Sequence, residues 1–219
     1  MLSQRSLDFL KDLSKNNNRD WFLANKARYE ADLKKPFEEF IGKLIQAVQQ
    51  LDNRVQIEPK KAIFRINRDT RFSKDKSPYK TNVGAIISPA GAKGKEFPGF
   101  YIHVEQGLLM LGGGAYFLEK EPLHQVRQYI SLHPKRFQEI IKHPDFVSKF
   151  GAIKGEQNKK LPTEFQEAAV NQPLLYNKQF YFMAELAPHH ALGTEAIPFA
   201  MAYFSAGKPL NDFLIEALA

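Results

Sequence analysis

The hydrophobic pattern of this chain changes its period twice, and that change constrains the fold more than any other feature. Up to Leu51 the apolar residues recur every three or four positions, which is the spacing of amphipathic helices. From Ala62 they alternate with polar residues, as in half-buried strands, and beyond residue 119 the helical spacing returns. Strands gathered between two helical parts predict an α+β fold, with a central antiparallel sheet of about four or five strands flanked by N-terminal and C-terminal helices.

Length and composition fit an ordinary globular protein. The 219 residues predict a single α+β domain over 1–219, with a helical part at 1–55, the sheet at 60–116 and a mainly helical part at 119–219. The chain has no cysteine, which excludes disulfides, thiol nucleophiles and thiolate metal sites. No apolar run reaches the ~18 residues of a membrane span, so we expect a soluble, cytoplasmic protein without a membrane partner.

Local patterns give more detailed expectations. The expected strands are 62–66, 83–87, 100–105 and 108–111, the last two forming a hairpin, while 180–186 fits a strand or a helix. Pro36 either opens a second helix or kinks one long helix. The glycines at 112–114 indicate a bulge or a close backbone approach. Gly207 and Pro209 predict a break between two final helices, over 194–206 and 210–218.

One segment carries almost all of the net charge of +7. Residues 60–80 contain eight of the 31 cations and two of the 24 anions, so the rest of the chain is nearly neutral. Arg65, Arg68 and Arg71 are spaced by three and begin inside an apolar stretch. The planar guanidinium group matches the oxygens of carboxylates and phosphates. We therefore expect these arginines to be partly buried near a strand end, with Asp69 bonded to one or more of them.

Other side chains near the basic segment have two interpretations each. Phe72 is expected to anchor the segment on the core, and Tyr79 either donates its hydroxyl to a bound oxygen or is a buried ring. Tyr101, His103 and Glu105 project from one face of their strand. That face is either the solvent side of the sheet or part of a mixed polar pocket with Arg65 and Asn67, in which His103 acts as acid or base and Glu105 as an arginine partner.

The motifs of this region resemble those of a known family. Arg65-x-x-Arg68-Asp69-x-Arg71-Phe72 is followed by Asp75-Lys76-x-x-Tyr79, and the run NNNRDWF occupies residues 16–22. Together with the length and the order of elements, this resembles the largely bacterial family called domain of unknown function 2461, over nearly the full chain. The resemblance implies that the basic segment is a family feature. It implies no reaction and no cofactor, so whether the protein is an enzyme stays open.

Three functions remain, and the surroundings of the arginines distinguish them. The favoured one is a site for a small phosphate- or carboxylate-bearing ligand, with or without a reaction. The second is a nucleic-acid-binding module whose groove includes Phe72, Tyr79 and residues 93–95. The third is a structural or interaction protein whose arginines form internal ion pairs with Asp69, Asp75 and Glu105.

Adjacent His189 and His190 lack the spacing of metal ligands, so no metal site is expected. The candidate ligand-binding residues are Arg65, Arg68, Asp69, Arg71, Lys76, Tyr79, Lys80, His103 and Glu105.

Overall fold

The computed structural model describes residues 1–94 and 97–219, which form two compact units. The first unit comprises Met1–Lys93, Tyr101–Leu111 and Glu185–Ala202. The second unit comprises Gly94–Phe100, Gly112–Ala184 and Tyr203–Ala219, apart from residues 95 and 96. The expected arrangement of the whole chain as one domain with three parts stays a prediction.

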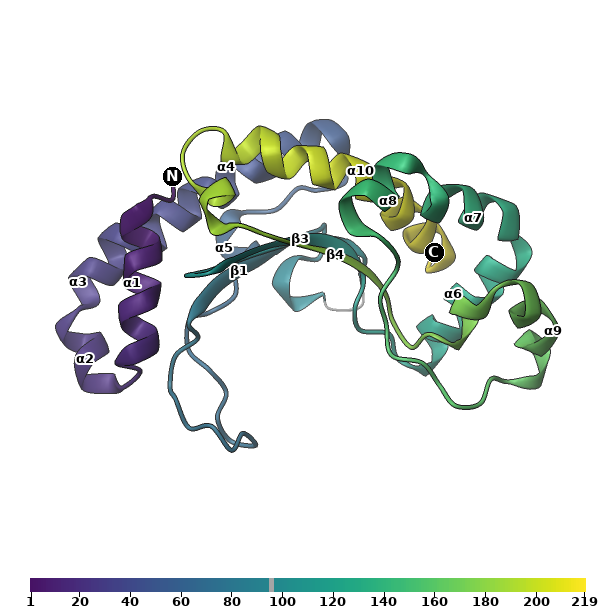
Figure 1. Ribbon diagram of the computed structural model, residues 1–219, viewed down its shortest axis with the longest axis horizontal. Coiled ribbons are helices and arrows are strands. Elements are labelled where there is room, and N and C mark those ends of the chain that lie inside the picture. The colour runs from purple at the N-terminus through teal and green to yellow at the C-terminus, as the bar shows by residue number, and fades with distance from the viewer. Residues whose placement is uncertain (95–96) are drawn as a thin grey trace. The chain divides into compact units, whose positions relative to one another are not determined.

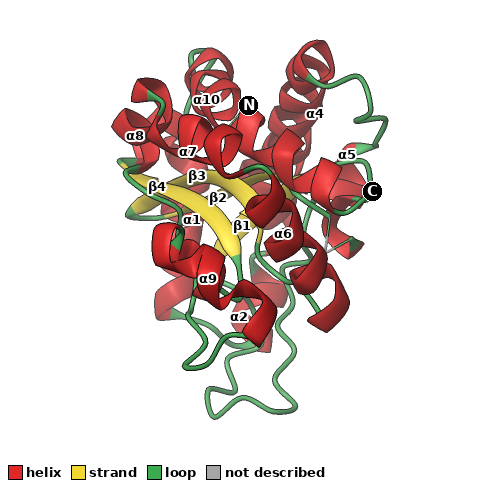
Figure 2. Ribbon diagram, turned by 90° about the vertical axis from the view of Figure 1, so that its right-hand side faces the viewer, coloured by secondary structure: helices red, strands yellow, loops and turns green. Residues whose placement is uncertain are grey.

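Four strands form one antiparallel sheet in the order β1-β2-β3-β4, drawn in yellow in Figure 2. They are β1 (Asn82–Ile87), β2 (Gly99–Glu105), β3 (Leu108–Ala115) and β4 (Phe180–Leu186). The predicted α+β class, the strand at 83–87 and the hairpin are confirmed. The ambiguous segment at 180–186 is a strand. Phe100, Ile102 and Val104 are buried on one face of β2, and the side chains between them lie on the other face.

The first unit begins with a series of helices. They are α1 (Gln4–Lys15), α2 (Arg19–Ala24), α3 (Lys26–Arg28), a π-helical segment (Tyr29–Lys34), α4 (Lys35–Leu51) and α5 (Pro59–Ala62). Pro36 lies in the first turn of α4, where its missing N–H costs nothing, so it opens a helix rather than kinking one. A 3₁₀ turn (Pro188–Ala191) precedes the last helix. Helix α4 packs against α5 and β1.

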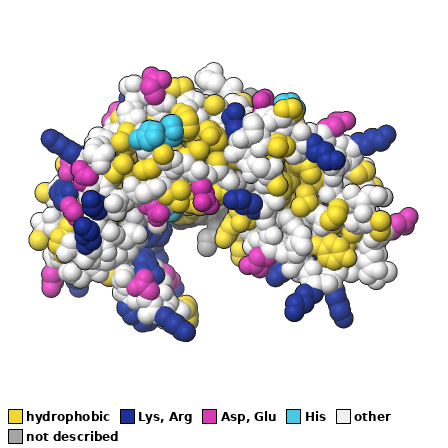
Figure 3. Space-filling view, viewed as in Figure 1, with side chains coloured by type: hydrophobic (Ala, Val, Ile, Leu, Met, Phe, Trp, Pro, Cys, Tyr) yellow, Lys and Arg dark blue, Asp and Glu magenta, His cyan; other side chains and the backbone are white. Residues whose placement is uncertain are grey.

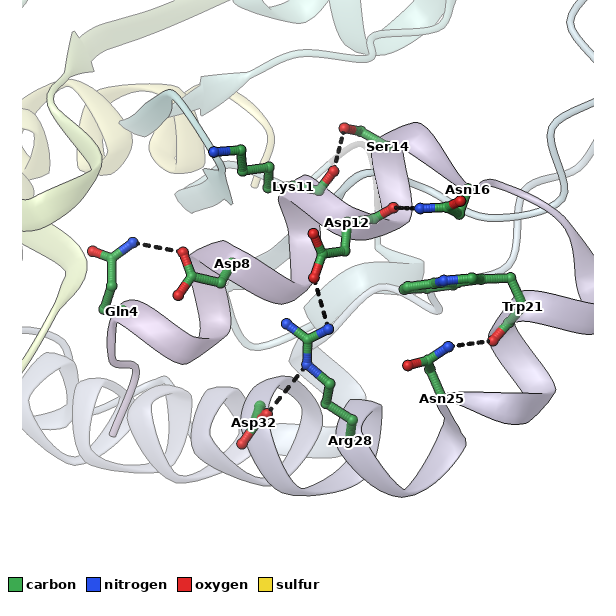
Figure 4. Close-up of polar contacts among 10 residues, drawn as sticks. All are labelled: Gln4, Asp8, Lys11, Asp12, Ser14, Asn16, Trp21, Asn25, Arg28 and Asp32. Atoms are coloured by element: carbon green, nitrogen blue, oxygen red, sulfur yellow. Dashed lines mark hydrogen bonds and ion pairs between the residues drawn. The ribbon is translucent and has the colours of Figure 1, made fainter.

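An arginine links the first helices to one another (Figure 4). Arg28 donates to Asp12 of α1 at 2.7 Å and lies 3.6 Å from Asp32, and its guanidinium is 5.5 Å from the centroid of the Phe9 ring. The side chain of Asn18 accepts a hydrogen bond from Trp21 N at 2.9 Å and caps α2, as residues that favour N-caps predict. The contact of Arg28 with Asp12 ties α3 to α1, and the Asn18 cap fixes the start of α2.

The second unit contains α6 (Lys120–Leu132), α7 (Pro134–Lys142), α8 (Pro144–Phe150) and α9 (Thr163–Asn171). A 3₁₀ turn (Pro173–Tyr176) follows α9, whereas the 3₁₀ turn Gly91–Lys93 belongs to the first unit. In α6, buried Arg127 donates to the carbonyl oxygens of Leu175 and Asn177, at 2.8 and 3.1 Å. None of the helices in the described part of the chain is long and apolar enough to span a membrane.

The predicted break before the C-terminus is wrong. A single helix, α10 (Ala196–Ala217), continues through Pro209. A proline inside a helix costs about 3 kcal/mol, but burial of Phe204, Leu210 and Phe213 outweighs that cost. Gly207 lies against the ring of Phe182, where a Cβ atom would come within 2.3 Å of ring carbons, so this glycine permits close packing instead of ending the helix.

The predicted strand over 62–66 is also wrong. Ala62 is the last residue of α5, and the following residues make only isolated pairings: Ile63 forms a bridge with Ala85, and Phe64 N donates to Gly84 O at 2.9 Å. The alternating pattern reflects an extended chain along the edge of β1. Helix α5 takes Ala62, the first residue of the expected strand, and the pairing with β1 covers Ile63 and Phe64.

Candidate functional site

The basic segment forms a long loop between Ile66 and Lys80, just before β1. Figures 1 and 2 show this loop extending from the first unit on the side of β1 away from α4. At its base, Lys80 N donates to Ile66 O at 2.8 Å, and Arg68 N donates to Pro78 O at 2.9 Å. The base is therefore a short antiparallel pairing, and residues 69–77 lie beyond it.

Asp69 and Arg71 form an ion pair within the loop. The Arg71 guanidinium donates to both oxygens of Asp69, at 3.0 and 2.7 Å, and these bonds lower the pKa of Asp69 to about 2. The predicted bond between Asp69 and an arginine is confirmed. The predicted partial burial of the three arginines is confirmed only for Arg68, whose side chain is 26% exposed. The Arg71 side chain is 76% exposed, and Arg65 is also exposed.

Asp75 joins the two sides of the loop. It pairs with Arg68 and accepts hydrogen bonds from Ser77 N at 2.9 Å and Ser77 Oγ at 2.7 Å. The bonds from Ser77 and then the guanidinium of Arg68 lower the pKa of Asp75. Lys76 Nζ donates to the carbonyl oxygen of Thr70 at 2.9 Å. In this structure the charges of Arg68 and Asp75 and the ammonium of Lys76 are used to shape the loop.

Tyr79 is a buried ring, which decides between its two interpretations. Its ring stacks on that of Phe22, with centroids 3.9 Å apart and planes 15° apart. The Asn17 side chain donates to Tyr79 O at 2.9 Å and accepts from Tyr79 N at 3.1 Å. Asn17 therefore ties the loop base to the segment between α1 and α2. Sequence reasoning missed its role, and the only signal was its place in the run at 16–22.

Replacing Asn17 with alanine is expected to lower the free energy of unfolding by about 1–3 kcal/mol, because both backbone groups of Tyr79 lose their partner. Urea unfolding measures this loss. Asn53→Ala is the matched control: its exposed side chain makes its truncation neutral within about 0.5 kcal/mol. Equal stability of the two variants would contradict the role given to Asn17.

Phe72 does not anchor the loop on the core, as the sequence had predicted. Its side chain is 95% exposed, and the Arg71 guanidinium carbon lies 5.7 Å from the ring centroid. The expectation fails because the loop leads away from the core instead of folding back over it. In Figure 3 the extending loop exposes basic, acidic and hydrophobic side chains.

Arg65 and Lys80 form a pair of like charges at the loop base. Burial, and then the positive charge of Arg65, lower the pKa of Lys80, whose Nζ lies 5.2 Å from the centroid of the Phe64 ring. Arg65 also contributes to the low pKa of Asp69, but that carboxylate is bonded to Arg71. Within residues 1–94 and 97–219, no carboxylate forms an ion pair with either of these two cations.

Tyr101, His103 and Glu105 form a chain of polar contacts along β2. Tyr101 Oη lies 3.1 Å from His103 Nδ1, and His103 Nε2 lies 3.3 Å from Glu105 Oε2. One neutral tautomer satisfies both contacts: Nε2–H donates to Glu105, and Nδ1 accepts from the Tyr101 hydroxyl. The His103 side chain is only 13% exposed. Glu105 thus pairs with the imidazole and not with an arginine, contrary to the role considered for it.

The loop base and β2 meet at the ring of Phe64. Its centroid lies 6.5 Å from that of Tyr101. Gly84 of β1 lies between them, because a Cβ atom there would be 3.6 Å from both the Phe64 ring and Tyr101 Oη. The structure therefore brings Lys80 and Tyr101 to the same phenylalanine ring, with His103 and Glu105 farther along β2, and the positive charge of Arg65 acts on Lys80. We call Arg65, Lys80, Tyr101, His103 and Glu105 the sheet-face site.

The sheet-face site combines positive charge with an imidazole that is held between a hydroxyl and a carboxylate. Arginine and lysine bind anionic oxygens. Of the described residues, no three His, Cys, Asp or Glu side chains are grouped to hold a metal ion. Phe64 and Gly84 were not among the predicted site residues, since nothing in their spacing distinguishes them from ordinary strand positions.

A separate open pocket of about 350 Å³ lies near the end of β4 in the first unit. Its lining consists of His189, His190, Leu192, Glu195, Pro198 and Phe199. The rings of His190 and Phe199 stack with centroids 4.1 Å apart. None of these residues belongs to the basic segment, so this pocket is not where the arginines gather.

The fold and the sheet-face site define an α+β protein with a cationic, histidine-containing site beside a structured basic loop. A family model described as "Conserved hypothetical protein (DUF2461)" matches residues 5–213. The chain therefore belongs to the DUF2461 family, as its motifs indicated. No curated protein and no solved structure matched it.

Proposed function

We propose that this protein binds a small anion bearing a phosphate or a carboxylate at the sheet-face site. The observation that carries the proposal is the pair formed by Arg65 and Lys80. Two neighbouring cations without a carboxylate partner in the described residues repel each other, and the partial burial of Lys80 adds a desolvation cost. A bound anion cancels the repulsion and offsets the desolvation cost, which favours anion binding at this place.

The polar chain on β2 supports the same proposal. A ligand held by Lys80 lies on the face that carries Tyr101 and His103. The imidazole contacts a hydroxyl on one side and a carboxylate on the other, which fixes its orientation. If the bound anion is a substrate, His103 is the residue that we assign to proton transfer.

The other two functions have partial support. The ion pairs of Arg68 and Arg71 favour a structural role for those two arginines. A nucleic-acid groove that includes Tyr79 has little support, because the Tyr79 ring is buried under Phe22. Residue 95 of the same groove lies outside the described residues.

Calorimetric titration with inorganic phosphate, pyrophosphate and citrate tests the proposal. Two charge-assisted contacts contribute about 1.5–3 kcal/mol each, so we expect saturable binding with a Kd of about 1 mM or below. The affinity should fall by less than about tenfold between 50 and 200 mM salt, because few charges are neutralised. Absence of saturable binding of all three anions would contradict the proposal.

A further inference from the structure

Of the large hydrophobic side chains in the described residues, Phe72 is the most exposed, and it lies beyond the base of the loop between Ile66 and Lys80. It is 95% exposed, whereas the next, Val170 on α9, is 79% exposed. A phenylalanine left in water forgoes the stabilisation that its burial would give. This side chain therefore contributes nothing to the core, and it is accessible to a binding partner.

The loop that carries Phe72 is held by its own polar contacts. Two ion pairs, Asp69 with Arg71 and Arg68 with Asp75, and the bond from Lys76 to a backbone oxygen all join loop residues to one another. Such contacts do not add to the core, but they favour this conformation of the loop before a partner binds. Pre-ordering of this kind lowers the entropy cost of binding.

The charge around Phe72 indicates an anionic partner. Arg71 precedes it, Lys74 follows two positions later, and both side chains are exposed. Residues 66–79, which exclude the sheet-face site, contain four cations and two anions. The partner therefore combines negative charge with a flat apolar surface that accepts an aromatic ring.

We propose that Phe72 inserts between bases of a nucleic acid, while Lys74 and the Nη1 group of Arg71, which the ion pair with Asp69 does not use, contact the adjacent phosphates. Phenylalanine wedges flanked by basic residues unstack base steps in this way, and a base stacked on an aromatic ring is worth about 1–3 kcal/mol. A membrane is a poorer match, because a single ring between polar neighbours buries too little apolar area for stable anchoring. The proposal is independent of the sheet-face site, whose residues it does not use.

Fluorescence anisotropy with labelled single-stranded and duplex DNA and RNA of mixed sequence, at 50 mM salt, tests this inference. Phe72→Ala is expected to weaken binding by about 5- to 100-fold, the fold-change that the loss of one stacking contact gives. Its salt dependence should stay unchanged, while Lys74→Gln should reduce the salt slope by about one unit. Thermal melting of both variants should match the parent, since the two side chains are exposed.

Leu132→Ala is the matched control, because it removes another exposed apolar side chain, 68% exposed, from the second unit. It should leave oligonucleotide binding unchanged. Failure of the parent to bind any oligonucleotide, or equal binding by Phe72→Ala, would overturn the inference. So would binding to phosphatidylcholine–phosphatidylserine vesicles that Phe72→Ala abolishes, without binding to oligonucleotides. Phosphate titrations of Phe72→Ala should match the parent, so the two proposals fail separately.

Discussion

The double variant Arg65→Gln, Lys80→Gln is expected to bind phosphate, pyrophosphate and citrate at least about 100-fold more weakly than the parent. It removes two charge-assisted contacts of about 1.5–3 kcal/mol each, and about 1.4 kcal/mol corresponds to a tenfold change in Kd. Calorimetric titration of both proteins measures the difference.

Stability distinguishes a lost ligand site from a damaged fold. The double variant should melt at the same temperature as the parent or higher, because it removes two like charges, one of them partly buried. Lys60→Gln, Lys61→Gln is the matched control: it removes two exposed charges from α5 and should bind the anions nearly as the parent does. Equal losses in the two double variants would mean that net charge, and not the sheet-face site, attracts the anion.

Replacing Gly114 with alanine is expected to lower the free energy of unfolding by at least about 3 kcal/mol. Gly114 has a φ of 96°, which L side chains rarely adopt, and a Cβ atom there would lie 2.3 Å from Phe180 O and 2.7 Å from Tyr181 Cα. Since β4 backbone occupies that space, strand β3 or β4 must shift. Thermal unfolding should show a decrease of roughly 6–12 °C.

The hairpin offers its own control for Gly114→Ala. Gly107 lies in the turn between β2 and β3, and a Cβ atom there would meet nothing within 4 Å. Gly107→Ala is expected to be neutral within about 0.5 kcal/mol. If Gly114→Ala unfolded at the same temperature as Gly107→Ala, this result would contradict the close approach of β3 and β4 at Gly114.

Much of the fold follows from hydrophobic periodicity. The alternation from Phe100 to Glu105 predicts the exposed and buried faces of β2, and the glycines at 112–114 predict the close approach that the structure shows, with Phe182 O only 2.3 Å from a Cβ at Gly112. The local pattern gives a wrong prediction at two places. Burial of side chains along α10 outweighs the helix-breaking tendency of Pro209, and helix α5 includes the start of the segment at 62–66.

The motif was easier to find than to interpret. Spacing shows that Arg68 and Arg71 follow an extended segment, but it cannot show whether the chain then turns into the core or leaves it. The carboxylates that pair with these two arginines belong to the same loop, namely Asp75 and Asp69. Both arginines therefore stabilise the loop instead of lining an anion site. Arg65 is the motif arginine without such a partner in the described residues, a difference that depends on tertiary structure.

The central claim is that Lys80 and Arg65 hold an anion, and the pKa of Lys80 tests it most directly. NMR of the lysine side chains, with Lys80→Arg to assign the signal, measures this pKa with and without inorganic phosphate. Without phosphate we predict a pKa below the ordinary 10.5, because of burial and the charge of Arg65. Saturating phosphate should raise it, because an anion at hydrogen-bond distance stabilises the ammonium form. A Lys80 pKa that phosphate leaves unchanged while it binds to the protein would contradict the account.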